Sequence, residues 1–71
     1  MFKQEVAKKI QEARKAKGWT QTQLARKMGV NRITITKYES GKLNMSLDVI
    51  NHIAESLEVA PSIIFSPKSD Q

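Results

Sequence analysis

Two opposite helix signals lie close together in the middle of the chain and restrict its fold more than any other feature. Gly29 can adopt the left-handed backbone that ends a helix, and Asn31 is a good N-cap for the next one. Upstream, Thr20 predicts a helix start, and Gln23 three residues later completes a capping box. The chain must therefore form a helix of about two turns, a turn of about three residues, and a second short helix.

The segment that follows this turn, residues 32–39, has a pattern that needs interpretation. "RITIT" alternates β-branched apolar and hydroxyl residues as a half-buried strand does, yet no partner strand is evident. In a helix, Ile33 and Ile35 lie about 200° apart and cannot face the same core. We expect Ile35 and Tyr38 to point inward. The outer face then carries the residues Arg32, Ile33, Thr36, Lys37 and Ser40.

Three further helices complete the predicted fold. Residues 2–16 are amphipathic and end before Gly18, which can supply a left-handed cap. Ser46 caps a helix whose apolar stripe is expected to comprise Leu47, Ile50, Ile53, Ala54 and Leu57. Pro61 suits the first turn of a last helix, residues 61–65. We predict an all-α domain of five helices over residues 1–65, followed by a flexible tail, residues 66–71.

Composition excludes several classes of function. The 71 residues contain no cysteine, no apolar run near 18 residues, and charges where a signal peptide needs apolar residues, so we expect a cytoplasmic protein without a membrane span. His52 is a lone histidine without a second metal ligand nearby in the sequence. With no nucleophile–base pair and no phosphate-binding glycine loop, we predict no enzyme activity, no cofactor, no metal and no small-molecule ligand.

The charge is distributed unevenly along the chain. Residues 1–42 hold 11 Lys and Arg against 3 Asp and Glu, a net charge of +8, whereas residues 43–71 hold 1 against 4, a net charge of −3. A polyanion would bind the first portion, although lysine-rich helices are also common for solubility alone.

The motif between residues 21 and 38 resembles the helix-turn-helix of the phage repressor and Cro family, also called Xre-like. Seven positions of the family pattern are matched, by Leu24, Ala25, Met28, Gly29, Val30, Ile35 and Tyr38. The resemblance extends over about residues 5–65 through "ARKAKGWTQTQLA", "YESGK" and "SLDVINHIAESLEV". Glu58 and Met45 depart from it, since the family commonly has glycine and proline there. The resemblance implies a lambda repressor-like five-helix domain that acts as a sequence-specific, DNA-binding transcriptional regulator.

In that family the second helix of the motif enters the major groove of double-stranded DNA. We therefore expect base contacts from the outer face of residues 32–39, with Arg32 suited to guanine and Ile33 to a thymine methyl group. Ile33 could instead be an isolated exposed apolar residue. The expected base contacts are Arg32, Ile33, Thr36 and Lys37; the expected phosphate contacts are Arg14, Gln21, Asn31, Thr34, Ser40 and Lys42. Each of the latter could alternatively be only a cap or a solvated polar residue.

The remaining expectations concern one ion pair within the chain and the partners that the chain binds. Arg14 and Glu39 match a family pair that links the first helix to the end of the recognition helix. A pair at the surface would contribute little stability, and the alternative is two independent surface charges. We expect a homodimer on a near-palindromic operator, because one small domain makes few base contacts. The expected dimer interface comprises Leu43, Met45, Ile64 and Phe65, with Ile63 as a further apolar candidate. The alternative is an antitoxin, or a protein-interaction module that keeps the fold and binds a protein partner.

Overall fold

The computed structural model describes residues 2–64, excepting the side chain of Phe2, and these residues form helices without any strand. The elements are α1 (Phe2–Ala16), α2 (Gln21–Met28), α3 (Arg32–Tyr38), α4 (Leu47–Leu57) and α5 (Pro61–Ile64). The predicted all-α fold class and the order of five helices are confirmed. The predicted tail, residues 66–71, lies outside the described residues, as does the predicted end of the domain at residue 65.

The helix boundaries follow from capping residues that the sequence predicted. Thr20 accepts a hydrogen bond from the Gln23 N–H at 3.1 Å, and the Gln23 side chain accepts one from the Thr20 N–H at 2.7 Å, so the capping box is complete. Gly29 has φ +76° and ends α2. Asn31 and Ser46 cap α3 and α4 through their side-chain oxygens. α3 ends one residue earlier than predicted, because Glu39 serves as its C-cap.

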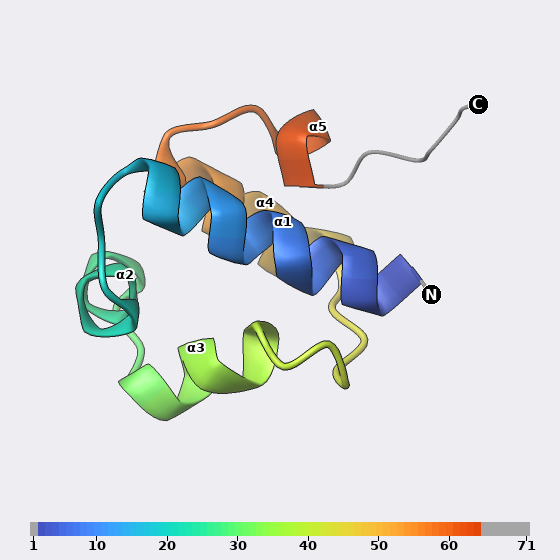
Figure 1. Ribbon diagram of the computed structural model, residues 1–71, viewed down its shortest axis with the longest axis horizontal. Helices are drawn as coiled ribbons and strands as arrows, with labels where there is room; N and C mark the ends of the chain where they lie inside the picture. The colour runs from blue at the N-terminus through green and yellow to red at the C-terminus, as the bar shows by residue number, and fades with distance from the viewer. Residues whose placement is uncertain (1, 65–71) are drawn as a thin grey trace.

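The helices enclose one apolar core, and α3 lies at its edge. In Figure 1, α3 runs along the lower side of the molecule and α5 lies on the opposite side. The inner faces of all five helices contribute to this core, which consists of Val6, Ile10, Ala13, Leu24, Ala25, Met28, Ile35, Ile50, Ile53, Ala54, Leu57 and Ile64. Tyr38, Trp19 and Met45 pack against it while partly exposed. One face of α3 is thereby fixed to the core, and the other faces solvent.

Two apolar residues lie where the sequence analysis did not expect them. Leu47 is 57% exposed and outside the core, because it begins α4 and the core starts one turn later, at Ile50. Ile64 is completely buried. Its expected place in a dimer interface is therefore wrong, since a side chain that packs inside its own domain cannot reach a partner. Phe65, expected in the same interface, lies outside the described residues.

At the end of α4, Glu58 stands where the family that the sequence resembles commonly has a glycine. Glu58 adopts the left-handed conformation, with φ +61°, and still caps the helix. Its carboxylate accepts a hydrogen bond from Lys17 Nζ at 2.6 Å, and this contact lowers the pKa of Glu58 below its ordinary value. The Lys17 ammonium also lies 5.3 Å from the centre of the Trp19 ring. These contacts join the ends of α1 and α4.

No helix within residues 2–64 combines the length and apolar character required to cross a lipid bilayer.

Candidate nucleic-acid interface

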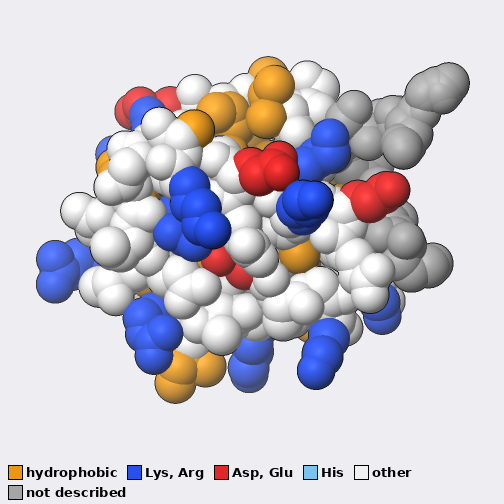
Figure 2. Space-filling model, in the orientation of Figure 1, with side chains coloured by type: hydrophobic (Ala, Val, Ile, Leu, Met, Phe, Trp, Pro, Cys, Tyr) orange, Lys and Arg blue, Asp and Glu red, His pale blue; other side chains and the backbone are white. Residues whose placement is uncertain are grey.

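The outer surface of α3 gathers the four residues predicted to contact bases. Arg32, Ile33, Thr36 and Lys37 are all exposed, and Ile35 on the opposite face is completely buried. Helical geometry places these four side chains on adjoining turns, where the sequence analysis expected them. Figure 2 shows Lys and Arg side chains along the lower side of the molecule, over α3, with a hydrophobic group protruding among them. We call these four residues the α3 surface.

The turn before α3 uses two predicted phosphate-contact residues for capping. Asn31 Oδ1 accepts hydrogen bonds from the Thr34 N–H at 3.0 Å and from the Thr34 hydroxyl at 3.2 Å. Its Nδ2 group makes no hydrogen bond within residues 2–64. The cap thus engages the oxygen of the Asn31 amide, and an amide N–H is the kind of donor that binds a phosphate oxygen.

The loop after α3 is held in a fixed shape close to the α3 surface. The Ser40 hydroxyl donates to the Lys37 carbonyl at 2.7 Å and accepts from the Lys42 N–H at 3.1 Å. Gly41 between them has φ +79°, and a Cβ there would lie 3.3 Å from Gln4 Cγ on α1. The loop therefore packs directly on α1, and the exposed side chain of Lys42 extends from it.

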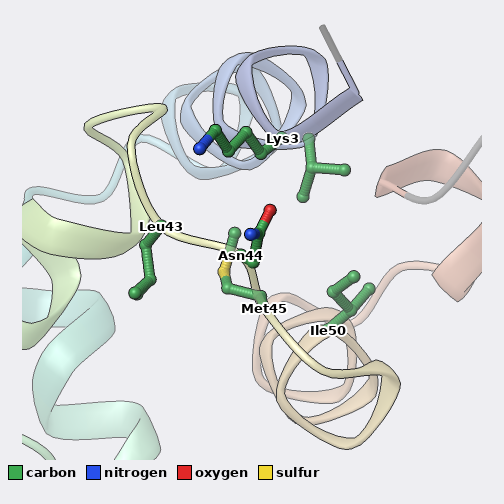
Figure 3. A pocket seen from close by; sticks show the side chains of 6 residues that line it. Lys3, Leu43, Asn44, Met45 and Ile50 are labelled. Atoms are coloured by element: carbon green, nitrogen blue, oxygen red, sulfur yellow. The ribbon is translucent and has the colours of Figure 1, made fainter.

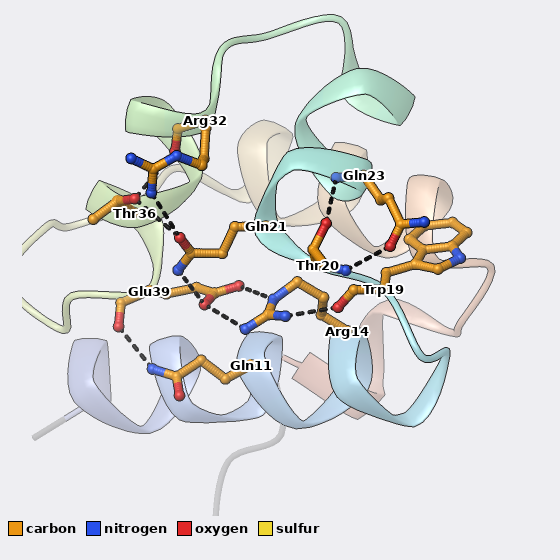
Figure 4. Close-up of polar contacts among 9 residues, drawn as sticks. All are labelled: Gln11, Arg14, Trp19, Thr20, Gln21, Gln23, Arg32, Thr36 and Glu39. Atoms are coloured by element: carbon orange, nitrogen blue, oxygen red, sulfur yellow. Dashed lines mark hydrogen bonds and ion pairs between the residues drawn. The ribbon is translucent and has the colours of Figure 1, made fainter.

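A buried ion pair joins α1 to the end of α3. Arg14 Nε donates to Glu39 Oε2 at 2.7 Å and Nη2 donates to Oε1 at 3.1 Å, while Nη1 donates to the Trp19 carbonyl at 2.7 Å (Figure 4). The side chains of Arg14 and Glu39 are only 10% and 3% exposed. The two residues therefore form the link between α1 and the end of α3 that the resemblance implied, and they form it as a buried pair. Each guanidinium nitrogen of Arg14 already has a protein partner.

Gln21 connects this buried pair to the α3 surface. Its Nε2 donates to Glu39 Oε1 at 3.0 Å, and its Oε1 accepts from the Thr36 hydroxyl at 3.2 Å and from Arg32 Nη1 at 3.4 Å (Figure 4). Because Glu39 fixes which way the amide points, its oxygen faces α3. The sequence analysis missed this role. Its only signal was that Gln21 opens α2, the helix that precedes α3 in the helix-turn-helix.

The one histidine of the chain is on α4 and not on the α3 surface. His52 lies on the exposed side of α4, beside Asp48 and Glu55. Within residues 2–64 no group of three or more His, Cys, Asp or Glu is arranged to hold a metal ion. The α3 surface offers groups suited to recognition, namely hydrogen-bond donors, positive charges and one apolar side chain, all exposed on the outer face of α3.

The residues predicted to form a dimer interface differ in how far they are exposed. Leu43 is 39% exposed, whereas Met45 is half-buried against the core. Both line a small pocket of about 90 Å³ together with Lys3 and Asn44, which Figure 3 shows between α1, the loop and α4. With Ile64 buried, the described residues leave Leu43 and Met45 as the remaining members of the expected interface.

Comparison with known proteins gives matches over most of the chain. Residues 10–64 match HTH_3, a family described as helix-turn-helix. The antitoxin HipB of Escherichia coli O6:H1 is 34% identical over 59 residues, which make up 83% of this chain. The match spans only 63% of the length of HipB.

Two solved structures share the arrangement of helices. One is the restriction-modification controller protein C.AhdI from Aeromonas hydrophila, which superposes with a TM-score of 0.80 at 32% identity, covering 87% of this chain and 90% of that one. The other, a hypothetical transcription factor NHTF from Neisseria, has a TM-score of 0.86 at 30% identity and covers 94% of this chain and 77% of that one.

Proposed function

The chain belongs to the HTH_3 family of repressor- and Cro-like helix-turn-helix DNA-binding regulators, and from this premise we propose that it reads a near-palindromic operator sequence-specifically, with α3 in the major groove. The observation that carries the proposal is the α3 surface: two cations, a hydroxyl and an apolar side chain exposed on one helix face. A helix that only packed against its own domain would not need this combination.

Base contacts are assigned to the α3 surface. The Arg32 guanidinium can donate two hydrogen bonds to the N7 and O6 acceptors of one guanine, and each such contact discriminates by about 1–3 kcal/mol. Lys37, about one turn further along α3, adds a single positive charge that suits a guanine or a phosphate. The Thr36 hydroxyl is partly occupied by Gln21 Oε1 and the Arg32 carbonyl. Ile33 can make only apolar contacts.

Phosphate contacts are assigned to residues that flank α3. Gln21, Asn31, Thr34, Ser40 and Lys42 lie at the N-termini of α2 and α3 or on the following loop, where backbone N–H groups also favour an anion. Arg14 is reassigned from phosphate contact to positioning, because its guanidinium is committed to Glu39 and Trp19. It holds Glu39, and Glu39 in turn holds Gln21.

A homodimer is proposed because one α3 surface covers only a few base pairs. Two copies related by a two-fold axis would place their α3 helices in successive major grooves, about 34 Å apart. Leu43 is the exposed apolar candidate for the contact between copies, with Met45 beside it. Analytical ultracentrifugation of wild type and Leu43→Asp tests this assignment. A dimer in the wild type that becomes a monomer in the variant supports it, and an unchanged dimer contradicts it.

The test of the proposed function compares specific with random DNA. Duplexes enriched from a random pool are titrated with wild type, Arg32→Ala and the control Arg26→Ala, which removes the same charge from an exposed position on α2. Arg32→Ala should lower the ratio of specific to random affinity by about 5- to 150-fold, the equivalent of 1–3 kcal/mol. Arg26→Ala should leave that ratio unchanged. A ratio that Arg32→Ala does not alter would contradict base readout by this residue.

A second candidate function is supported by the 34% identity with the antitoxin HipB. In this alternative the chain keeps the fold and also binds a protein partner. Purification of a tagged chain from its native cells distinguishes the two readings. A second protein recovered in a fixed molar ratio, and retained after DNA is digested, favours the antitoxin reading, whereas recovery of the chain alone favours an independent regulator.

A further inference from the structure

Ile33 is the most exposed large hydrophobic residue within residues 2–64. It is 61% exposed, compared with 39%, 57% and 54% for Leu43, Leu47 and Ile63. It lies on α3 between the positively charged side chains of Arg32 and Lys37. On the premise that the chain binds DNA, the two cations attract the DNA backbone to this face. The exposed side chain of Ile33 then lies against the bases, where only an apolar group can make a favourable contact with it. Its β-branched side chain loses little rotamer freedom on binding, because the helix already restricts it.

The major groove offers one apolar group to such a side chain. Each base pair displays hydrogen-bond donors and acceptors there, and the C5 methyl group of thymine is the exception. Isoleucine can neither donate nor accept a hydrogen bond, so it distinguishes bases only through this methyl group. Cytosine has a hydrogen atom at the same carbon, and methylation at C5 restores the group in the same place.

On the premise of the proposed function, we propose that Ile33 makes DNA binding depend on the 5-methyl group of a pyrimidine, so that 5-methylcytosine is accepted as thymine is and unmethylated cytosine is disfavoured. The methylation state of cytosine in an operator would then regulate its occupancy by this chain. The chemical class of the ligand is a 5-methylpyrimidine, whether thymine or methylated cytosine.

Arg32, which precedes Ile33, indicates which base lies next to the 5-methylpyrimidine. Arg32 directly precedes Ile33, and its Nη1 lies 3.4 Å from Gln21 Oε1, which limits the directions available to the guanidinium. The N-terminal residues of a recognition helix contact base edges, and Arg32 and Ile33 both lie there, so we take their contacts to fall on neighbouring base pairs. Since Arg32 suits the N7 and O6 atoms of guanine, we infer that the 5-methylpyrimidine is adjacent to a guanine.

The expected effect of one methyl group is modest but measurable. Burial of one such group stabilises by ~0.8 kcal/mol, which corresponds to a change in affinity of about fourfold. When both half-sites of a near-palindromic operator are altered, the two effects multiply to about fifteenfold. Replacement of Ile33 by alanine removes the apolar contact and should abolish the dependence on the methyl group.

The experiment uses duplexes selected from a random pool with the wild-type chain. Each thymine is replaced in turn by deoxyuridine, which removes only the methyl group, and affinity is measured by fluorescence anisotropy. At the sensitive position, cytosine and 5-methylcytosine opposite guanine are then compared. Both series are repeated with Ile33→Ala and with the control Leu47→Ala, which truncates a similarly exposed apolar residue at the start of α4.

We expect one position per half-site, next to a guanine, at which loss of the methyl group costs wild type and Leu47→Ala about fourfold and Ile33→Ala nothing. Cytosine methylation should restore the same factor. If specific duplexes are obtained but every thymine tolerates deoxyuridine, or Ile33→Ala retains the dependence, the inference is overturned and the proposed function remains. If no sequence is enriched, the proposed function fails and the inference fails with it.

Discussion

The buried ion pair between Arg14 and Glu39 gives the most demanding prediction for the fold. Glu39→Gln keeps the size of the side chain and removes its charge. The Glu39 carboxylate accepts hydrogen bonds from Arg14 Nε at 2.7 Å, Arg14 Nη2 at 3.1 Å and Gln21 Nε2 at 3.0 Å, with only 3% of the side chain exposed. The variant leaves the Arg14 guanidinium buried without a counter-charge. Loss of one partner of such a pair costs about 3–5 kcal/mol.

That cost is large for a domain of this size. A 71-residue domain has a free energy of unfolding of about 4–11 kcal/mol. Urea denaturation followed by circular dichroism, at one fixed protein concentration, measures the change. The matched control is Glu58→Gln, which neutralises an equally short pair, since Lys17 Nζ lies 2.6 Å from Glu58 Oε1 with the glutamate 63% exposed. The control should change stability little, because solvent screens that pair.

A double variant separates the charge effect from packing. Arg14→Met combined with Glu39→Leu removes both buried charges, and we expect it to be more stable than Glu39→Gln alone. If Glu39→Gln and Glu58→Gln cost the same, or if the double variant is less stable than Glu39→Gln, the reasoning from burial is refuted.

Three further predictions concern single positions. Gly41→Ala should lower stability by about 1–2 kcal/mol in thermal unfolding, because φ is +79° and the new Cβ would approach Gln4 Cγ to 3.3 Å; no change would contradict the close packing of the loop on α1. Lys17→Met should raise the pKa of Glu58 toward its ordinary value of 4.5 in an NMR titration, because the lowered pKa comes first from the Lys17 hydrogen bond. Because the pKa of Glu58 is lower in the folded state than in the unfolded state, its contact with Lys17 stabilises the fold at pH values above the unfolded-state pKa. That stabilisation is lost as the pH falls through the folded-state pKa. An unchanged titration of Glu58 in Lys17→Met would refute the contact. Thr20→Ala should cost about 1 kcal/mol in urea, and a neutral result would show that the capping box is dispensable.

The sequence predicted well those features that depend on local chemistry. Thr20, Asn31 and Ser46 cap helices in the structure because an N-cap needs only a short side-chain acceptor and its own backbone. The orientation of α3 was also predictable, since Ile33 and Ile35 could not share one face of a helix. Burial of Ile35 and exposure of Ile33 confirm it.

Features that depend on distant parts of the chain were harder to predict. How far Arg14 and Glu39 are buried depends on contacts between segments distant in the chain, such as those of Gln11 and Gln21 with Glu39, and residue spacing does not reveal them. Gln21 was expected only as an anion-binding residue at the start of α2, yet its amide joins Arg32 and Thr36 of α3 to Glu39, the C-cap of that helix. Ile64 was assigned to an interface because an apolar residue near a chain end has the same pattern whether it covers the core or binds a partner.

Interference by guanine methylation tests the central claim, that α3 reads the major groove, most directly. Dimethyl sulfate methylates guanine at N7, the acceptor assigned to Arg32, and the operator fragments that the chain still binds are then sequenced. We predict interference at guanines in two clusters about 34 Å apart along the duplex, with interference lost at one guanine per cluster for Arg32→Ala. Binding that tolerates N7 methylation at every guanine and is blocked only by methylation of adenine N3 in the minor groove would contradict the account.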